Sequence, residues 1–312
     1  MELVDAFKMA SYKAWDEMEP VSGFSRITQV REDGLTPLIL KELARSGCSA
    51  IVDIIESPKH GKQSEKFLGY DFEIWIGTKT RKIRYIIQAK SQRNQYHLDS
   101  KYEIDTEQLV RLERYALVQR DYKAIPLYCY YKHLQEDDKT LNNYYNSHTV
   151  YDKKALGITV SSSLKVKSYN EISFHELHRF QYDIKNWFPN ILKYPSFFHY
   201  NEAMAATVPF HELALFTISQ IDAMNKRYHE IREKLRSLGV FPFFFFYPYS
   251  LFSNDGEKEN LIPVHNITRE EIISYAFGIG GKEVEVLSNR KEPLVPTKNF
   301  EGRALIIIET KE

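Results

Sequence analysis

The sequence has 312 residues, enough to bury a substantial core, and its content of 43% hydrophobic and 14% aromatic residues excludes a globally disordered chain. Basic and acidic residues number 42 each, so the chain lacks an overall positive charge that would by itself indicate nucleic-acid binding. The two cysteines, Cys48 and Cys129, form no CxxC pattern and fit neither a disulfide scaffold nor a cysteine metal site.

The first residues favour a cytoplasmic protein with no membrane partner. Residues 1–5 have neither the basic region nor the apolar run of a signal peptide, and no segment approaches the ~18 apolar residues of a membrane span. Apolar residues spaced along residues 3–18 predict an amphipathic helix. A second helix is expected from about Asp33 to Ser46, ended by Gly47, and residues 50–56 predict a first strand.

The next segment predicts a β-hairpin around which the rest of the chain is arranged. Two runs rich in β-branched and aromatic residues, 69–76 and 82–90, flank a short polar segment that begins with Gly77. A turn centred on residues 79 and 80 places Ile76 opposite Ile83.

This register brings polar side chains together at the far end of the hairpin. With Ile76 opposite Ile83, Asp71 lies opposite Gln88. Alternate residues share one face of a strand, so Gln88 and Lys90 lie on one side, and Asp71 and Glu73 likewise share a face. A carboxylate, an amide and an ammonium group therefore converge.

The converging residues resemble the site of the PD-(D/E)xK nuclease superfamily, in particular the restriction-endonuclease-like, Mrr-like variants in which Gln replaces the first acid of the second strand. The matching residues are Asp71 in GYDFEIWI and Gln88, Ala89 and Lys90 in IIQAK. Residues 106–131 are also similar to the segment that follows QAK in an uncharacterised bacterial family of this type. In that family a helix with a leading Gln precedes a strand resembling PLYxxY.

The resemblance implies metal-dependent hydrolysis of phosphodiester bonds. This reaction needs a hard divalent cation, Mg²⁺ or Mn²⁺, held by oxygen ligands, and a positive group near the water or the phosphate. Asp71 would supply the carboxylate, while Gln88 and the carbonyl of Ala89 would supply neutral oxygen ligands. Lys90 would orient or help to deprotonate water and stabilise charge in the transition state. Because Gln88 carries no charge, the site needs a further carboxylate.

Acids near the hairpin are candidates for this carboxylate. In the superfamily an acid often comes from the helix before the first strand, and here Glu32 or Asp33 opens the predicted helix. Glu65 lies shortly upstream of Asp71, and Glu73 lies within the hairpin itself. Glu32 and Glu65 are ranked above Glu73.

The hairpin region is locally basic although the chain as a whole is neutral. Between Gly77 and Lys101 the sequence has seven basic residues and one acid, Asp99, which gives this segment a net charge of +6. Such a patch beside a metal site suits a phosphate backbone, and a solvated hairpin tip explains it equally well. The residues predicted to contact nucleic acid are Arg81, Arg84 and Arg93.

The remaining elements alternate between predicted helices and strands. A helix from Thr106 to about Val118 includes Gln108, which is interpreted as a surface residue although it could approach the site. Strands are expected over 125–131, 155–161 and 303–310, and helices over 173–187, 210–238 and from Thr268. Residues 135–147 are polar and predict a long loop or a boundary, and the Phe-rich run 240–249 predicts a buried strand or an oligomer contact.

The expected fold is α/β, with a restriction-endonuclease-like mixed central sheet flanked by helices. Residues 1–150 are predicted to form the nuclease core, and residues 151–312 an α+β region of unknown role that could complete the same domain. The expected function is a metal-dependent endonuclease acting on nucleic acid, with DNA preferred, and the resemblance implies a homodimer or a partner in defence against foreign DNA. Two alternatives stay open: a catalytically inactive nucleic-acid-binding module, and a subunit of a larger complex.

Overall fold

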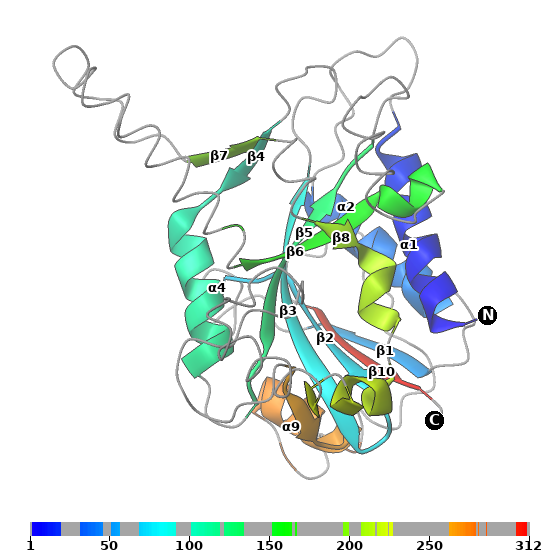
Figure 1. Ribbon diagram of the computed structural model, residues 1–312, viewed down its shortest axis with the longest axis vertical. Helices are drawn as coiled ribbons and strands as arrows, with labels where there is room; N and C mark the ends of the chain where they lie inside the picture. Colours follow the sequence, from blue (N-terminus) through cyan, green and yellow to red (C-terminus); the bar gives the residue numbers. More distant parts are fainter. Residues whose placement is uncertain are drawn as a thin grey trace, which may run out of the picture.

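The computed structural model describes a sheet, which includes the predicted hairpin, and helices on both faces of this sheet (Figure 1). The described residues are 2–19, 32–45, 51–56, 69–91, 101–118, 122–133, 152–163, 166, 196–199, 207–215, 217–223, 225–226, 262–278, 280, 285 and 304–310. Glu65, Arg93, the predicted helix at 173–187 and the Phe-rich run at 240–249 lie outside them.

A mixed sheet forms the centre of the molecule. Among the described residues its order is β1-β10-β2-β3-β5-β6-β8, and β9 also pairs with β3. The pairs β10–β2 and β3–β5 are parallel, and the other pairs are antiparallel. The strands are β1 (Ile51–Glu56), β2 (Phe72–Gly77), β3 (Arg81–Ser91), β5 (Ile125–Tyr131), β6 (Ile158–Ser162), β8 (Val208–Pro209), β9 (Val264–Asn266) and β10 (Ala304–Glu309). A separate pair joins β4 (Lys101–Ile104) to β7 (Ser196–His199).

Helices cover both faces of the sheet, which makes the fold α/β as predicted. On one face, α1 (Leu3–Glu17) and α2 (Glu32–Arg45) pack on alternate residues of the central strands, with the short 3-10 helices η1 (Lys153–Leu156) and η3 (Phe210–Ala214) beside α1. On the other face lie α4 (Thr106–Val118) and α9 (Arg269–Phe277), as Figure 1 shows. Because strand side chains alternate between faces, β3 contributes its odd-numbered residues to the first core and its even-numbered residues to the α4 and α9 side.

The predicted hairpin and its register are confirmed. Ile76 pairs with Ile83, and Phe72 pairs with Ile87. The backbone N–H of Asp71 donates to the carbonyl of Ile87 at 2.9 Å, which continues the ladder by one residue. The turn closes through the N–H of Thr78, which donates to the carbonyl of Arg81 at 2.8 Å.

The order of elements expected from the sequence is also found: α2, β1, β2, β3, α4 and β5 occur in this order, with the short strand β4 added between β3 and α4. The predicted helix at Thr268 is confirmed as α9, with reciprocal capping bonds between Thr268 and Glu271 and a left-handed Gly278 at its end. The predicted strand at 303–310 is β10, and it lies between β1 and β2 within the sheet. Strands from both predicted regions of the chain therefore share one sheet.

The helix predicted to begin at Phe210 starts differently, and this prediction is wrong. Residues 210–214 form the 3-10 helix η3, and helical residues resume only after Thr217. There the backbone N–H of Thr217 donates to Gln220 Oε1 at 2.8 Å, while the N–H of Gln220 donates to Thr217 Oγ1 at 3.3 Å. This reciprocal cap starts a new helix and explains the interruption. Over the part of the chain that the structure describes, none of the helices has the length and apolar character needed to cross a bilayer.

Candidate functional site

Asp71 and Gln88 meet where the β2–β3 hairpin ends, as the register predicts. The Nε2 of Gln88 and the backbone N–H of Ala89 each donate to Asp71 Oδ2 at 2.6 Å. Gln88 Nε2 also lies 3.2 Å from the carbonyl oxygen of Ala89. Gln88 is buried, with 1% of its surface exposed, whereas Asp71 is half-buried. A carboxylate oxygen and a carbonyl oxygen thus converge on one buried amide.

Lys90 joins this group through a residue from α4. The Nζ of Lys90 donates to Gln108 Oε1 at 2.9 Å, and Gln108 Nε2 donates to Gln88 Oε1 at 2.7 Å. The structure therefore brings Asp71, Gln88 and Lys90 together, and it places Gln108 between the last two. The interpretation of Gln108 as a surface residue is wrong. One feature of the sequence could have identified Gln108 as a site residue, namely its position as the leading Gln of the helix that follows the QAK segment.

Gly69 allows α4 to approach the hairpin this closely. It adopts a left-handed backbone with φ of 78°. A Cβ at this position would lie 2.8 Å from the carbonyl oxygen of Gln108 and 3.0 Å from the backbone nitrogen of Leu112. Only glycine avoids both the strained backbone and the collision. The residue two positions before Asp71 is thus packed directly on the helical turn that carries Gln108.

Tyr128 adds an unsatisfied hydroxyl close to the group. It pairs with Gln88 in the parallel β3–β5 ladder and is completely buried. Burial raises the pKa of Tyr128, and the carboxylates of Asp105, Glu113 and Asp71 raise it further, so the phenol stays neutral. Its hydroxyl has no hydrogen-bond partner among the described residues.

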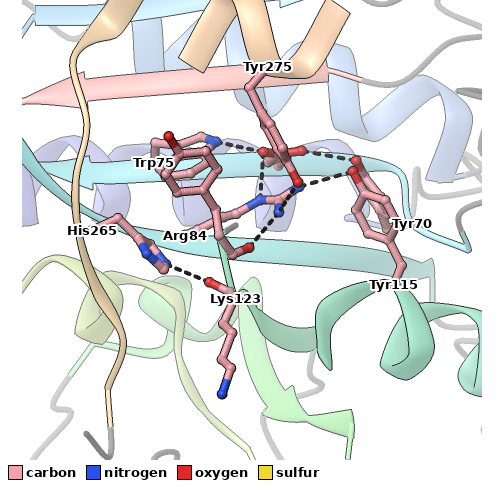
Figure 2. Close-up of polar contacts among 9 residues, drawn as sticks. Tyr70, Trp75, Arg84, Tyr115, Lys123, His265 and Tyr275 are labelled. Carbon is pink, nitrogen blue, oxygen red and sulfur yellow. Dashed lines mark hydrogen bonds and ion pairs between the residues drawn. The ribbon is translucent and has the colours of Figure 1, made fainter. Parts of the chain in front are cut away.

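Glu73 is buried in a second cluster on the same face of the sheet, together with Tyr70, Trp75 and Arg84, which Figure 2 labels. Its carboxylate accepts hydrogen bonds from Tyr70 Oη at 2.9 Å, from Trp75 Nε1 at 2.6 Å and from Arg84 Nε at 2.9 Å. The side chains of Arg84 and Glu73 are 0% and 2% exposed. The carboxylate of Glu73 is therefore committed to three donors, which argues against it as a metal ligand.

Arg84 is held in this cluster from all sides. Its guanidinium donates to the carbonyl of Tyr122 at 2.9 Å and to the hydroxyls of Tyr275 and Tyr115 at 3.2 and 3.1 Å. Its Cζ lies 5.1 to 5.4 Å from the ring centroids of Trp75, Tyr115 and Tyr275. Burial is the largest single effect on the pKa of Arg84 and lowers it, but Glu73, Tyr115, Tyr70 and Tyr275 together outweigh burial, so the pKa is raised well above its ordinary value.

The prediction that Arg84 contacts nucleic acid is wrong, because its guanidinium is enclosed by protein. Lys82, another of the basic residues counted toward the local charge, is also buried and pairs with Glu309 at 2.9 Å. Arg81 is half-exposed and forms a bidentate pair with Asp222 at 2.8 and 3.0 Å. The basic surface beside the hairpin is thus smaller than the sequence indicated.

Among the candidates for the further carboxylate, Glu73 alone has a described side chain, and three donors already occupy it. Within the described residues no group of three or more His, Cys, Asp or Glu side chains could hold a metal ion. Glu32 is the first residue of α2, but its side chain is not among those described, and Glu65 lies outside the described ranges. The ligand types present are one carboxylate, one amide and one carbonyl oxygen, with an ammonium group two residues beyond the amide.

The fold and the site define an α/β protein with a mixed, helix-flanked sheet and a half-buried polar group at one end of its central hairpin. The chain belongs to a family of unknown function, DUF6615, whose model matches residues 3–189, more than half of the sequence. The matched range includes Asp71, Gln88, Lys90 and Gln108, and it ends before α9 and β10. Comparison with curated proteins and with solved structures finds no match.

Proposed function

We propose that this protein is a metal-dependent nuclease of the PD-(D/E)xK type, with a restriction-endonuclease-like core, that hydrolyses phosphodiester bonds of nucleic acid, preferentially DNA. The observation that carries the proposal is the convergence of Asp71, the Gln88-Ala89 segment and Lys90 at the end of the β2–β3 hairpin. The order of elements around this hairpin, from α2 to β5, supports the same assignment.

The ligand types fit a hard divalent cation such as Mg²⁺ or Mn²⁺. Gln88 Nε2 lies between Asp71 Oδ2 and the Ala89 carbonyl at 2.6 and 3.2 Å, so two oxygens suited to such a cation already face one point. Asp71, Ala89 O and Gln88 Oε1 would hold the ion, with Glu65 or Glu32 as the further carboxylate. When bound, the ion would supply an activated water and neutralise phosphate charge.

The remaining roles belong to the side chains themselves. Lys90 orients the attacking water or helps to deprotonate it, and its positive charge stabilises the charge that develops on the phosphate. Arg81 and Arg93 contact the phosphate backbone. A cytoplasmic location, a homodimer and a role in defence against foreign DNA complete the proposal, and the last two rest on the family resemblance alone.

A second candidate is a module of the same fold that binds nucleic acid, or a partner subunit, without catalysis. Gln88 favours it, because its amide nitrogen and not its oxygen faces Asp71, and because Gln in place of an acid leaves Asp71 as the sole carboxylate of the described group. Such a module would bind nucleic acid equally well with or without a divalent cation. A subunit of a complex would bind none at low salt.

The test is cleavage of plasmid, linear duplex, single-stranded DNA and RNA by purified protein with Mg²⁺ or Mn²⁺. We expect Asp71→Asn and Lys90→Met to abolish cutting while the protein stays folded. Matched controls are Asp16→Asn and Lys13→Met, which alter half-exposed charges of the same types on α1. Cutting that survives both site variants would refute the site, and absence of cutting by the wild type, with metal-independent binding, would favour the second candidate.

A further inference from the structure

Four side chains of the candidate site form one directional chain of hydrogen bonds. Lys90 donates to Gln108, Gln108 donates to Gln88, and Gln88 donates to Asp71, at 2.9, 2.7 and 2.6 Å. The two ends fix the direction, because an ammonium group has only donors and a carboxylate has only acceptors. The orientations of both amides follow from these ends, with Gln108 Oε1 toward Lys90 and Gln88 Oε1 toward Gln108.

Reversing one amide of this chain requires reversing the other. Gln88 has 1% of its surface exposed, so a reversed Nε2 finds its acceptor within the protein and not in water. The group facing that position is the amide of Gln108, which is held against the hairpin by the close contact at Gly69. Gln108 would then turn its Oε1 toward Gln88 and its Nε2 toward Lys90. Two donors would face each other, and the bond between Lys90 and Gln108 would be lost.

We infer that Gln108 is a positioning residue that couples the orientation of Gln88 to the freedom of Lys90. The inference rests on the proposed function, in which Gln88 presents its Oε1 beside Asp71 and Ala89. While Gln88 points its Nε2 at Asp71, Lys90 is tethered to α4. Once Gln88 presents its oxygen instead, Lys90 is released toward the water and the phosphate. The ammonium group thus becomes available only when the ligands of the cation are in place.

The test is a double-mutant cycle on Mn²⁺ affinity, measured by calorimetry without any nucleic acid. Lys90→Met removes the fixed donor end of the chain, so it should tighten Mn²⁺ binding. Part of this effect is the removal of a nearby positive charge, which does not depend on Gln108. The coupling of Lys90 to Gln88 through Gln108, which we call the relay, adds a further factor of about ten, the size of one charge-assisted hydrogen bond. This factor should disappear in the Q108M background.

The outcomes separate the relay from the proposed function. If Asp71→Asn leaves Mn²⁺ affinity unchanged, both the metal site and the relay are overturned. If binding depends on Asp71 but K90M tightens it by the same factor with and without Q108M, the relay alone is overturned. Lys13→Met on α1 serves as the lysine control and should have no effect.

Three further measurements guard against a variant that misfolds. Q108E offers an acceptor to both neighbours, so it should also abolish the extra factor, and circular dichroism establishes that each variant is folded. In the wild type, the side-chain amide resonances of both Gln88 and Gln108 should shift when Mg²⁺ is added, although only Gln88 is a proposed ligand. A shift confined to Gln88 would overturn the relay.

Discussion

Arg84→Met removes the cation from the buried cluster while the Glu73 carboxylate stays in place. That carboxylate is 2% exposed, and it would lose its ion pair and keep the neutral donors Tyr70 and Trp75. Removing one partner of a buried ion pair typically costs about 3–5 kcal/mol, because the remaining charge has no compensation. The total free energy of unfolding of a domain is about 5–15 kcal/mol, so we expect a large fraction to be lost.

The companion variants show where this cost arises. Glu73→Gln should be destabilising by a similar amount, since it leaves Arg84 charged and buried. The double variant removes both charges, and its cost should fall at least about 2 kcal/mol below the sum of the single variants. Urea denaturation followed by circular dichroism measures all three free energies of unfolding.

Arg81→Met is the matched control for this series, because Arg81 lies on the same strand and also forms an ion pair with a carboxylate. Its side chain and that of Asp222 are 40% and 44% exposed, and an exposed pair contributes about 0–1 kcal/mol. A cost for Arg84→Met no greater than that for Arg81→Met, or strictly additive costs for the two cluster variants, would refute the reasoning.

Three other predictions concern single positions. Gly69→Ala should lower the free energy of unfolding by about 1–3 kcal/mol, because residue 69 has a positive φ and its Cβ would collide with α4. The same variant should weaken Asp71-dependent Mn²⁺ binding, and unchanged binding would contradict the proposed packing. Burial, with a smaller effect of Lys8, lowers the pKa of His211 to about 4, below its ordinary value of 6.5. Stability should therefore be complete above pH 6.5 and fall by up to about 3 kcal/mol toward pH 4, a loss that His211→Gln should remove; the same slope in the variant would contradict it. Burial also lowers the pKa of Lys132 to about 7 from 10.5, so stability should fall as the pH drops from 10.5 toward 7. Lys132→Met should remove this pH dependence, and urea titrations that find the same slope between pH 10.5 and 7 in the variant would contradict the prediction.

The hairpin could be predicted because its information is local. The alternation of apolar residues fixes which side chains share a face, and a short polar turn fixes the register, so Asp71 opposite Gln88 follows from spacing alone. The helices α1, α2 and α9 follow in the same way from periodicity and caps. Gln108 could not be ranked as a site residue, because a polar residue on a helix is ordinarily solvated. Whether it is instead buried depends on how the helix packs, which local sequence does not give.

Long-range packing accounts for the errors. Arg84 was counted as surface charge, although it lies between Ile83 and Tyr85 in an apolar run and shares a face with Glu73. Its burial depends on Tyr275, which lies 191 positions away in the sequence. Likewise, the pattern of residues 304–309 predicts a strand but says nothing about its neighbours. Strand order in a mixed sheet is decided by contacts of this length, which local patterns do not encode.

The placement of β10 has a consequence for how the protein is made. Thr310 follows β10 and bonds to Gly77 at the end of β2, across 233 positions of sequence. At synthesis rates of ~5–20 residues per second, about 10–50 s pass between the emergence of the two strands. During this interval β10 does not yet cover its edge of β2. An uncovered strand edge presents unpaired backbone N–H and C=O groups that can pair with another chain. We therefore expect the nascent chain to depend on chaperones that cover this edge, and we expect the hairpin that carries the site to become rigid only after residue 309 has left the ribosome.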